Sequence, residues 1–209
     1  MMDIQNKNRK LLKKNHVYDE TMEHDACGVG LVASTEGLKS RKVVEYGIEA
    51  LKAVWHRGAI DADGKTGDGA GIHIEIPNDF FAEKIEITGH EHDNSDLCVG
   101  MIFLPRNDFG GQEQCRSIVE SELTKKNFNI YGWRQVPVDP SVLGEKAEQT
   151  RPEITQVLFT HNDKSIHGKD LERALYETRR KIEKEALRNH LNNFYICSFS
   201  STSIIYKRS

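Results

Sequence analysis

Cys27 stands in the surroundings that best suit a catalytic nucleophile. It follows a polar, charged leader, residues 1–26, and precedes Gly28 and Gly30, which would let a substrate carbonyl approach the backbone closely. If the leader is removed, Cys27 becomes the first residue, and an α-amino group, which titrates near ~8, can take the proton of the neighbouring thiol. The alternative is that Cys27 is a small core residue, since free cysteines are commonly buried.

Two further segments carry charged side chains next to glycines. Arg57 lies in a His-Arg-Gly triplet, residues 56–58, at the end of an expected helix. A cation at this position can satisfy the last carbonyl groups of the helix. Asp68 lies in the glycine-rich stretch 66–71, where an aspartate commonly acts as a turn residue that bonds its own backbone. No Gly-Lys-Ser/Thr follows, so this stretch is not a phosphate-binding P-loop.

The other thiols and the histidines carry weaker signals. Cys98, Cys115 and Cys197 lie in apolar runs or on an expected helix, and no two cysteines form a C-x-x-C pair. We therefore expect inert thiols in a reducing compartment, the cytoplasm. His90 and His92 lie in a polar loop that does not space them as metal ligands, so no metal site is expected.

The composition is that of an ordinary globular chain. The formal net charge of −3, with 37% hydrophobic and 29% charged residues, gives no sign of a nucleic acid or an anionic membrane as partner. No run approaches the ~18 apolar residues that a membrane helix needs. The length suits a single domain. We assign residues 1–26 to a leader or propeptide and residues 27–209 to the domain.

Apolar periodicity predicts the elements that position these residues. Small apolar residues predict a buried strand at 27–33. Three- and four-residue spacing after the N-cap candidate Ser40 predicts a helix that ends at residues 56–58. Trp55 on this helix and Trp133 are expected in the core. Further strands are predicted at 72–76, 98–104, 129–138 and 154–160, a hairpin at 194–200 and 203–207, and further helices at 78–83, 110–126 and 168–189, the last with Leu171, Leu175, Ile182 and Leu187 facing inward. So many adjacent strands favour a mixed or antiparallel α+β domain.

Taken in chain order, the sequence around Cys27 and several later segments resemble the start of the large (α) subunit of the glutamate synthase family. That start is a class II glutamine amidotransferase domain with the N-terminal-nucleophile hydrolase fold. The similar segments are residues 23–30, 56–58, 66–71, 76–77, 98–105, 132–134, 136–137 and 194–207, and the resemblance covers residues 25–207. It implies the N-terminal part of a four-layer αββα sandwich. It also implies that Cys27 is the nucleophile and that Arg57, Gly58, Gly28 and Asp68 support its pocket.

The same resemblance implies a glutaminase. Cys27 would hydrolyse L-glutamine through a thioester to glutamate and ammonia, and the parent enzyme would use the ammonia to convert 2-oxoglutarate to glutamate. No cofactor is implied for this domain. For the parent, the resemblance implies FMN, an iron–sulfur cluster and either NADPH or ferredoxin as electron donor. The implied partners are the remaining domains of the large subunit and a small electron-transferring subunit.

Two segments of the family are missing from the sequence. The family holds the glutamine carboxylate with an arginine in an R-F-S-T-type segment and forms its oxyanion hole with an Asn-Gly pair in an H-N-G-E-type segment, and neither occurs here. We therefore expect the opening part of a longer protein. One alternative is a catalytically inactive fragment or interaction remnant of the same domain. Another is a different class II amidotransferase, such as an asparagine or phosphoribosylamine synthase, although those families usually begin at the initiator Met without such a leader.

Overall fold

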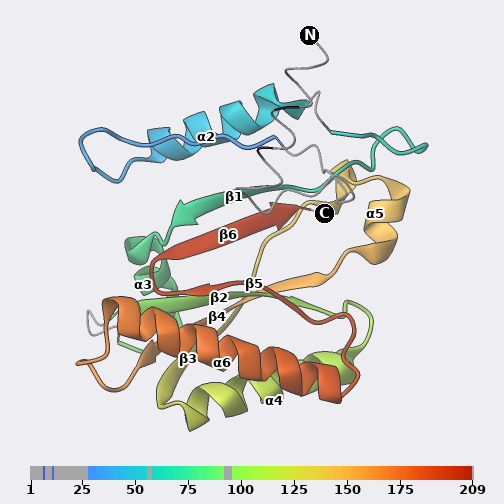
Figure 1. The fold of residues 1–209 in the computed structure, drawn as a ribbon. Coiled ribbons are helices and arrows are strands. Elements are labelled where there is room, and N and C mark those ends of the chain that lie inside the picture. The colour runs from blue at the N-terminus through green and yellow to red at the C-terminus, as the bar shows by residue number, and fades with distance from the viewer. Residues whose placement is uncertain (1–6, 8–10, 12–27, 56–57, 92–95, 209) are drawn as a thin grey trace.

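Two antiparallel sheets and the helices beside them make up the computed structural model, which describes residues 7, 11, 28–55, 58–91 and 96–208 (Figure 1). In chain order the elements are α2 (Arg41–Ala53), β1 (Ala70–Glu75), α3 (Asn78–Ile87), β2 (Leu97–Leu104), α4 (Phe109–Lys125), β3 (Phe128–Gln135), the 3-10 helix η2 (Pro140–Val142), α5 (Glu145–Thr150), β4 (Glu153–His161), α6 (Gly168–Arg188), β5 (Tyr195–Ser200) and β6 (Ser203–Arg208). Within these described ranges, no helix has the length and apolar character needed to cross a membrane.

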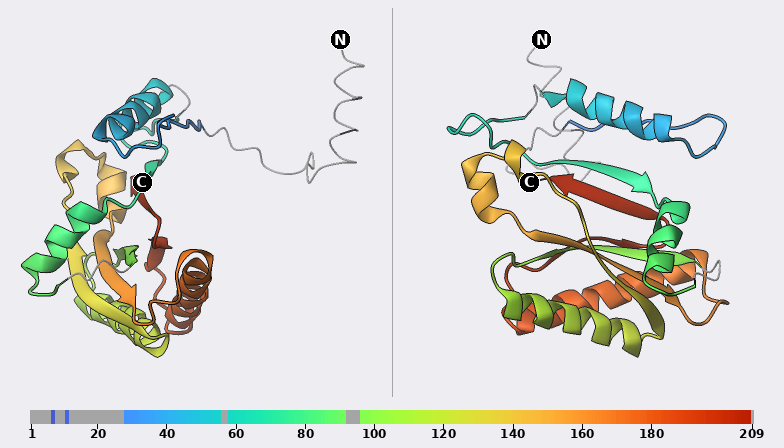
Figure 2. Two further views of the ribbon diagram at one scale, coloured as in Figure 1. Left: turned by 90° about the vertical axis from the view of Figure 1, so that its left-hand side faces the viewer. Right: turned by 180° about the vertical axis from the view of Figure 1, so that it is seen from behind.

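The layers follow the order helix, sheet, sheet, helix. One sheet has the strand order β3-β4-β2-β5 and the other pairs β1 with β6, and all these pairings are antiparallel. Helices α4 and α6 cover the outer face of the four-stranded sheet, and α2 lies beyond the two-stranded sheet (Figure 1, and in two further views Figure 2). The predicted α+β class is confirmed, and the layer order is the one that the resemblance implied.

Alternate residues of the four-stranded sheet point into two separate cores, because successive side chains of a strand face opposite sides. On β2, Cys98 and Ile102 face the helices, whereas Val99 and Met101 face the second sheet. The helix-side core is completed by Cys115, Val119 and Leu123 of α4 and by Leu171, Leu175 and Ile182 of α6. Every residue of β2 is buried, which confirms the prediction of a central strand.

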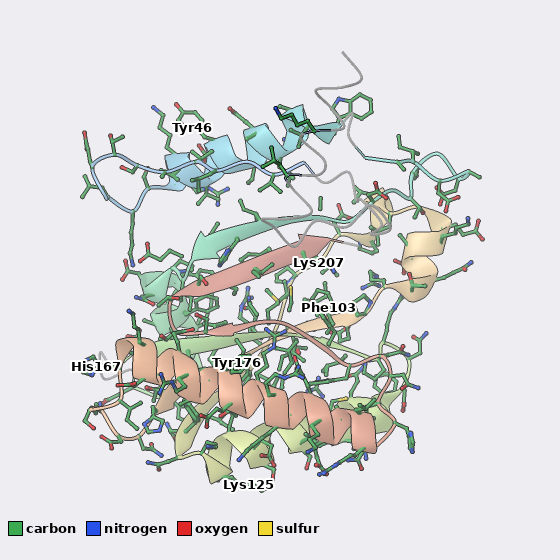
Figure 3. The ribbon with its side chains drawn as sticks, viewed as in Figure 1. Tyr46, Phe103, Lys125, His167, Tyr176 and Lys207 are labelled. Carbon is green, nitrogen blue, oxygen red and sulfur yellow. The ribbon has the colours of Figure 1, made fainter. Side chains whose placement is uncertain are left out.

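The core between the sheets is closed by one helix and by aromatic contacts. Phe81 and Ile85 of α3 are fully buried at one end of it. Phe103 of β2 packs against Tyr195 of β5, with ring centroids 5.8 Å apart. Lys207 of β6 lies 5.4 Å from the same tyrosine ring, so side chains from both sheets meet there (Figure 3).

Local signals explain where several helices begin. Ser40 caps α2, since its side-chain oxygen accepts the amide hydrogen of Lys42 at 3.2 Å. Asp108 caps α4 in the same way, accepting from the amide of Gly111 at 2.8 Å. The helices predicted after Ser40 and at 78–83, 110–126 and 168–189 are confirmed, as are the strands predicted at 72–76, 98–104, 129–138 and 154–160.

The predicted hairpin at the end of the chain is wrong. Although β5 and β6 are neighbours in sequence, β5 pairs with β2 and β6 pairs with β1. The carboxylate of Glu172 on α6 accepts the Ser201 amide at 2.7 Å and the Ser200 hydroxyl at 3.0 Å, and so holds the turn where the chain changes sheets. The change of sheet lets Ile204 enter the core between the sheets.

The predicted buried strand at 27–33 is also wrong for its described part, residues 28–33. This segment has no strand conformation, and Val29 and Leu31 are 90% and 92% exposed. A strand is stabilised by pairing with a neighbouring strand, and no described strand pairs with this segment.

Two side chains predicted to face the core are exposed instead. Trp55 is 71% exposed, because α2 lies on a sheet of only two described strands and buries none of its residues. Leu187 is 72% exposed. The buried face of α6 runs through Ile182 to Ala186, and Leu187 is one helical step away from that face.

Two glycine substitutions should change stability in opposite directions. In Gly100→Ala, the added methyl group would lie 2.7 Å from Val157 and 2.8 Å from the Phe199 ring, so overpacking should cost about 1–3 kcal/mol. In Gly47→Ala, the nearest atom is 3.6 Å away on Ile72, and alanine in a helix interior should stabilise the protein by roughly 0.5–1 kcal/mol. Urea denaturation of both variants measures the two effects, and a stabilised Gly100→Ala protein would contradict the described packing.

Candidate functional site

Three of the five predicted site residues lie in the described part of the chain. Cys27 and Arg57 lie outside the described residues. Gly28, Gly58 and Asp68 are described, and all three are exposed. The structure joins Gly58 and Asp68 through one hairpin, whereas Gly28 lies on a separate segment that approaches α2 where Gly30 faces Ala50.

Asp68 links the two arms of a short hairpin, residues 59–68. Its carboxylate accepts the amide hydrogen of Ala59 at 2.8 Å, and its own amide donates to the Ala59 carbonyl oxygen at 3.2 Å. Further in, Ile60 and Gly67 form an antiparallel bridge. Asp68 therefore bonds the backbone of the residue directly after Gly58, across the hairpin, and is a positioning residue for that segment.

The backbone of the hairpin leaves no room for a side chain at Gly67. A Cβ atom there would lie 2.9 Å from the carbonyl oxygen of Ala59 on the opposite arm. The second arm continues directly into β1, which begins at Ala70 and pairs with Arg208 at the end of β6. The two-stranded sheet thus fixes one arm of the hairpin, and Asp68 fixes the other arm to it.

The tip of the hairpin is shaped by Asp63. Its carboxylate accepts the amide hydrogens of Lys65 at 2.9 Å and Thr66 at 2.7 Å, together with the Thr66 hydroxyl. The Thr66 hydroxyl and then these amides hold the pKa of Asp63 well below its usual range, so the carboxylate is ionised at neutral pH.

An ion pair joins the hairpin to a distant helix. The ammonium group of Lys146 on α5 donates to both carboxylate oxygens of Asp61, each at 2.8 Å. The hydrogen bond from Lys146, followed by one from the Ala62 amide, lowers the pKa of Asp61. The sequence analysis missed Asp61, Asp63 and Lys146. The Asp-x-Asp-Gly pattern at 61–64 signals a turn, but no local pattern points to a lysine 85 residues away.

The three described thiols are buried and inert. Burial is the largest cause of the raised pKa at each of them, and it raises the pKa of Cys115 to about 11. At neutral pH these side chains are therefore protonated and poor nucleophiles. No group of three metal-ligating side chains occurs in ranges 28–55, 58–91 and 96–208 or at residues 7 and 11.

Removing the Asp68 carboxylate should loosen the arm that follows Gly58. In Asp68→Ala, the Ala59 amide loses its side-chain acceptor, and its hydrogen exchange, followed by NMR, should accelerate about 5-fold, as expected for the loss of one hydrogen bond. Asp68→Asn keeps an acceptor oxygen and should change exchange less. Equal exchange of Ala59 in the alanine variant and the unsubstituted protein would show that the bond does not hold this arm.

Known proteins with similar sequences place the chain in a family. Residues 27–209 match the family model for glutamine amidotransferases class-II. The glutamate synthase [NADPH] large chain of Azospirillum brasilense is 52% identical over 200 residues, which are 96% of this chain and 13% of that protein. Ferredoxin-dependent glutamate synthase 2 of Synechocystis sp. is 38% identical over 186 residues, 88% of this chain and 12% of that protein.

A plant relative agrees with these two. Ferredoxin-dependent glutamate synthase 1, chloroplastic/mitochondrial, of Arabidopsis thaliana is 37% identical over 193 residues, 90% of this chain and 12% of that protein. This chain therefore spans only 12 to 13% of the length of these relatives. The resemblance to glutamate synthase large subunits is confirmed, and the match over nearly the whole chain shows that it belongs to the class-II glutamine amidotransferases.

Proposed function

We propose that this chain is the glutamine-hydrolysing part of a glutamate synthase. The observation that carries the proposal is the family match, which extends from Cys27 to residue 209, together with 52% identity to a glutamate synthase large chain. L-glutamine is the proposed substrate, and glutamate and ammonia are the proposed products.

The proposed reaction uses Cys27 as both nucleophile and base. After removal of residues 1–26, the α-amino group takes the thiol proton, and the thiolate attacks the side-chain amide carbon of glutamine. As the C–N bond breaks, the same proton passes to the leaving nitrogen, which departs as ammonia, and a thioester remains. Water then adds to the thioester, and breaking the C–S bond releases glutamate and restores the thiol.

Arg57, Gly58 and Gly28 are proposed to line the glutamine pocket, with Asp68 acting through the backbone that follows Gly58. The Asp68–Ala59 hydrogen bond supports this, because it restrains the residue that follows Gly58. A restrained segment lowers the entropy cost of holding the substrate amide near the nucleophile.

The redox chemistry is proposed to lie in other parts of the parent enzyme. The thiols at Cys98, Cys115 and Cys197 are buried, and the described residues include no cluster of three metal ligands, so they do not fit an iron–sulfur cluster. Hydrolysis of an amide by a thiol nucleophile needs no electron transfer. We propose NADPH or ferredoxin as the donor, FMN and an iron–sulfur cluster elsewhere in the large chain, a small electron-transferring subunit as partner, and a cytoplasmic location.

A second proposal is that these 209 residues form a non-catalytic piece or interaction module of the same domain. The specific observation in its favour is that the sequence contains neither the R-F-S-T-type nor the H-N-G-E-type segment. In the family, the Asn-Gly pair of the H-N-G-E-type segment supplies two oxyanion donors. Removing a single oxyanion donor typically lowers the rate on the order of 100- to 1,000-fold.

Ammonia release from glutamine separates the two proposals. We expect a chain extended through both segments to be active and its Cys27→Ala variant to be inactive, because the nucleophile is lost. Residues 27–209 alone should be at least ~100-fold slower than the extended chain, because the oxyanion donors are absent. Comparable turnover by the short and extended chains would refute the second proposal, and full activity of Cys27→Ala would refute the first.

Covalent labelling tests the nucleophile directly. A glutamine-mimicking electrophile should label Cys27 of the extended chain and spare Cys98, Cys115 and Cys197, because burial raises the pKa values of those three thiols. Peptide mapping locates the label, and N-terminal sequencing should show active protein beginning at Cys27. In the unfolded protein all four thiols should react, which serves as the control. Labelling mainly at a buried cysteine, or a retained leader on fully active protein, would contradict the assignment.

A further inference from the structure

We propose that Gly144 and Lys146, at the start of α5, are positioning residues of the glutaminase site. They hold the hairpin at residues 59–68, and through it Gly58, in the arrangement that receives glutamine. This inference rests on the proposed glutaminase function. Figure 1 shows α5 beside the loop that precedes β1, although the two segments are far apart in the sequence.

The first contact is a bidentate ion pair. Lys146 donates to both carboxylate oxygens of Asp61 at 2.8 Å, near the start of the hairpin. Both side chains are partly exposed, Lys146 at 61% and Asp61 at 35%, so the pair by itself contributes modestly. The ion pair mainly orients the Asp61 side chain, because two hydrogen bonds to one carboxylate fix its direction.

The second contact requires the absence of a side chain at Gly144. A Cβ atom there would lie 2.5 Å from the Thr66 amide nitrogen, as well as 2.2 Å from its hydroxyl oxygen and 2.4 Å from an Asp63 carboxylate oxygen. The backbone of Gly144, with φ −75° and ψ 163°, is one that any L-residue adopts. Glycine is therefore needed for the close approach of the hairpin tip and not for its own conformation.

A third contact lies beside the second. The amide of Ala147 in the first turn of α5 donates to the Thr66 hydroxyl oxygen at 3.4 Å. Both ends of the loop at the hairpin tip, Asp61 and Thr66, are thus bonded to the same turn of α5. The tip itself is internally bonded, since the Asp61 amide donates to the Thr66 carbonyl oxygen at 2.7 Å.

Helix α5 can act as a support because it is tied to the four-stranded sheet. Arg106, two residues beyond the end of β2, donates to the Glu148 carbonyl oxygen at 3.1 Å and to its carboxylate at 2.6 Å. Arg151 donates to the other carboxylate oxygen of Glu148 at 2.9 Å. The hydrogen bonds from Arg151 and then Arg106 lower the pKa of Glu148, which stays ionised at neutral pH. A continuous set of contacts therefore runs from the end of β2 through α5 to the hairpin and Gly58.

Limited tryptic digestion of the 209-residue chain tests whether α5 holds the hairpin. Lys65 is exposed at the hairpin tip, so its peptide bond reports release of the tip. Cleavage after Lys65 should be on the order of 2- to 5-fold faster in Lys146→Met. It should be about 10-fold faster or more in Gly144→Ala, where backbone atoms must separate. Lys146→Arg keeps the cation and should restore slow cleavage.

Two matched variants serve as controls. Gly110→Ala places a methyl group no closer than 3.6 Å to its nearest neighbour, and Lys169→Met removes an exposed lysine from α6. Both should leave cleavage after Lys65 unchanged. If Gly144→Ala and Lys146→Met also leave it unchanged, α5 does not hold the hairpin and the inference is overturned.

Steady-state kinetics in the extended chain test the link to glutamine. A released hairpin reduces the fraction of molecules that can bind, so the KM for glutamine should rise in inverse proportion to the fraction that keeps the hairpin held, most in Gly144→Ala, while kcat is retained. Loss of folded protein would instead lower kcat at unchanged KM. An unchanged KM in active Gly144→Ala protein would refute the inference alone. No ammonia release by the unsubstituted extended chain would refute the proposed function and, with it, this role of α5.

Discussion

The structure depends on the burial of both faces of β2. A strand that is apolar on both sides is stable only when both faces are covered, and the eight residues of β2 are all buried. Helices α4 and α6 cover one face, and the β1–β6 sheet covers the other. Since apolar burial contributes ~25 cal/mol per Å², these two cores supply most of the driving force that fixes the layers.

The second core can form only because the chain changes sheets between β5 and β6. Glu172 makes this possible by accepting hydrogen bonds from Ser200 and Ser201 at the turn. Beyond the turn, Ile204 enters the core between the sheets and β6 pairs with β1. This pairing fixes the strand into which the 59–68 hairpin leads. The position of the candidate site therefore depends on the turn at Ser200 and Ser201, which links β5 of the four-stranded sheet to β6 of the two-stranded sheet.

The hairpin is stabilised differently from the cores. It is exposed, and its order comes from hydrogen bonds to the carboxylates of Asp61, Asp63 and Asp68 rather than from buried apolar area. Single exposed contacts of this kind are weak, so several must act together to hold the backbone in one conformation. Such a segment is well suited to a binding site, because it can be ordered while most of its residues remain exposed.

The sequence by itself determined the local elements and the family. Periodicity and the cap at Ser40 predict helices and strands because these signals act within a few residues. The surroundings of Cys27 and the motifs that follow it identify a class II amidotransferase. The tertiary structure alone decided the partner of β6, the exposure of Val29 and Leu31, and the contact between Lys146 and Asp61. Strand pairing and ion pairing join residues far apart in the chain, and their energies depend on the packing of every layer between them.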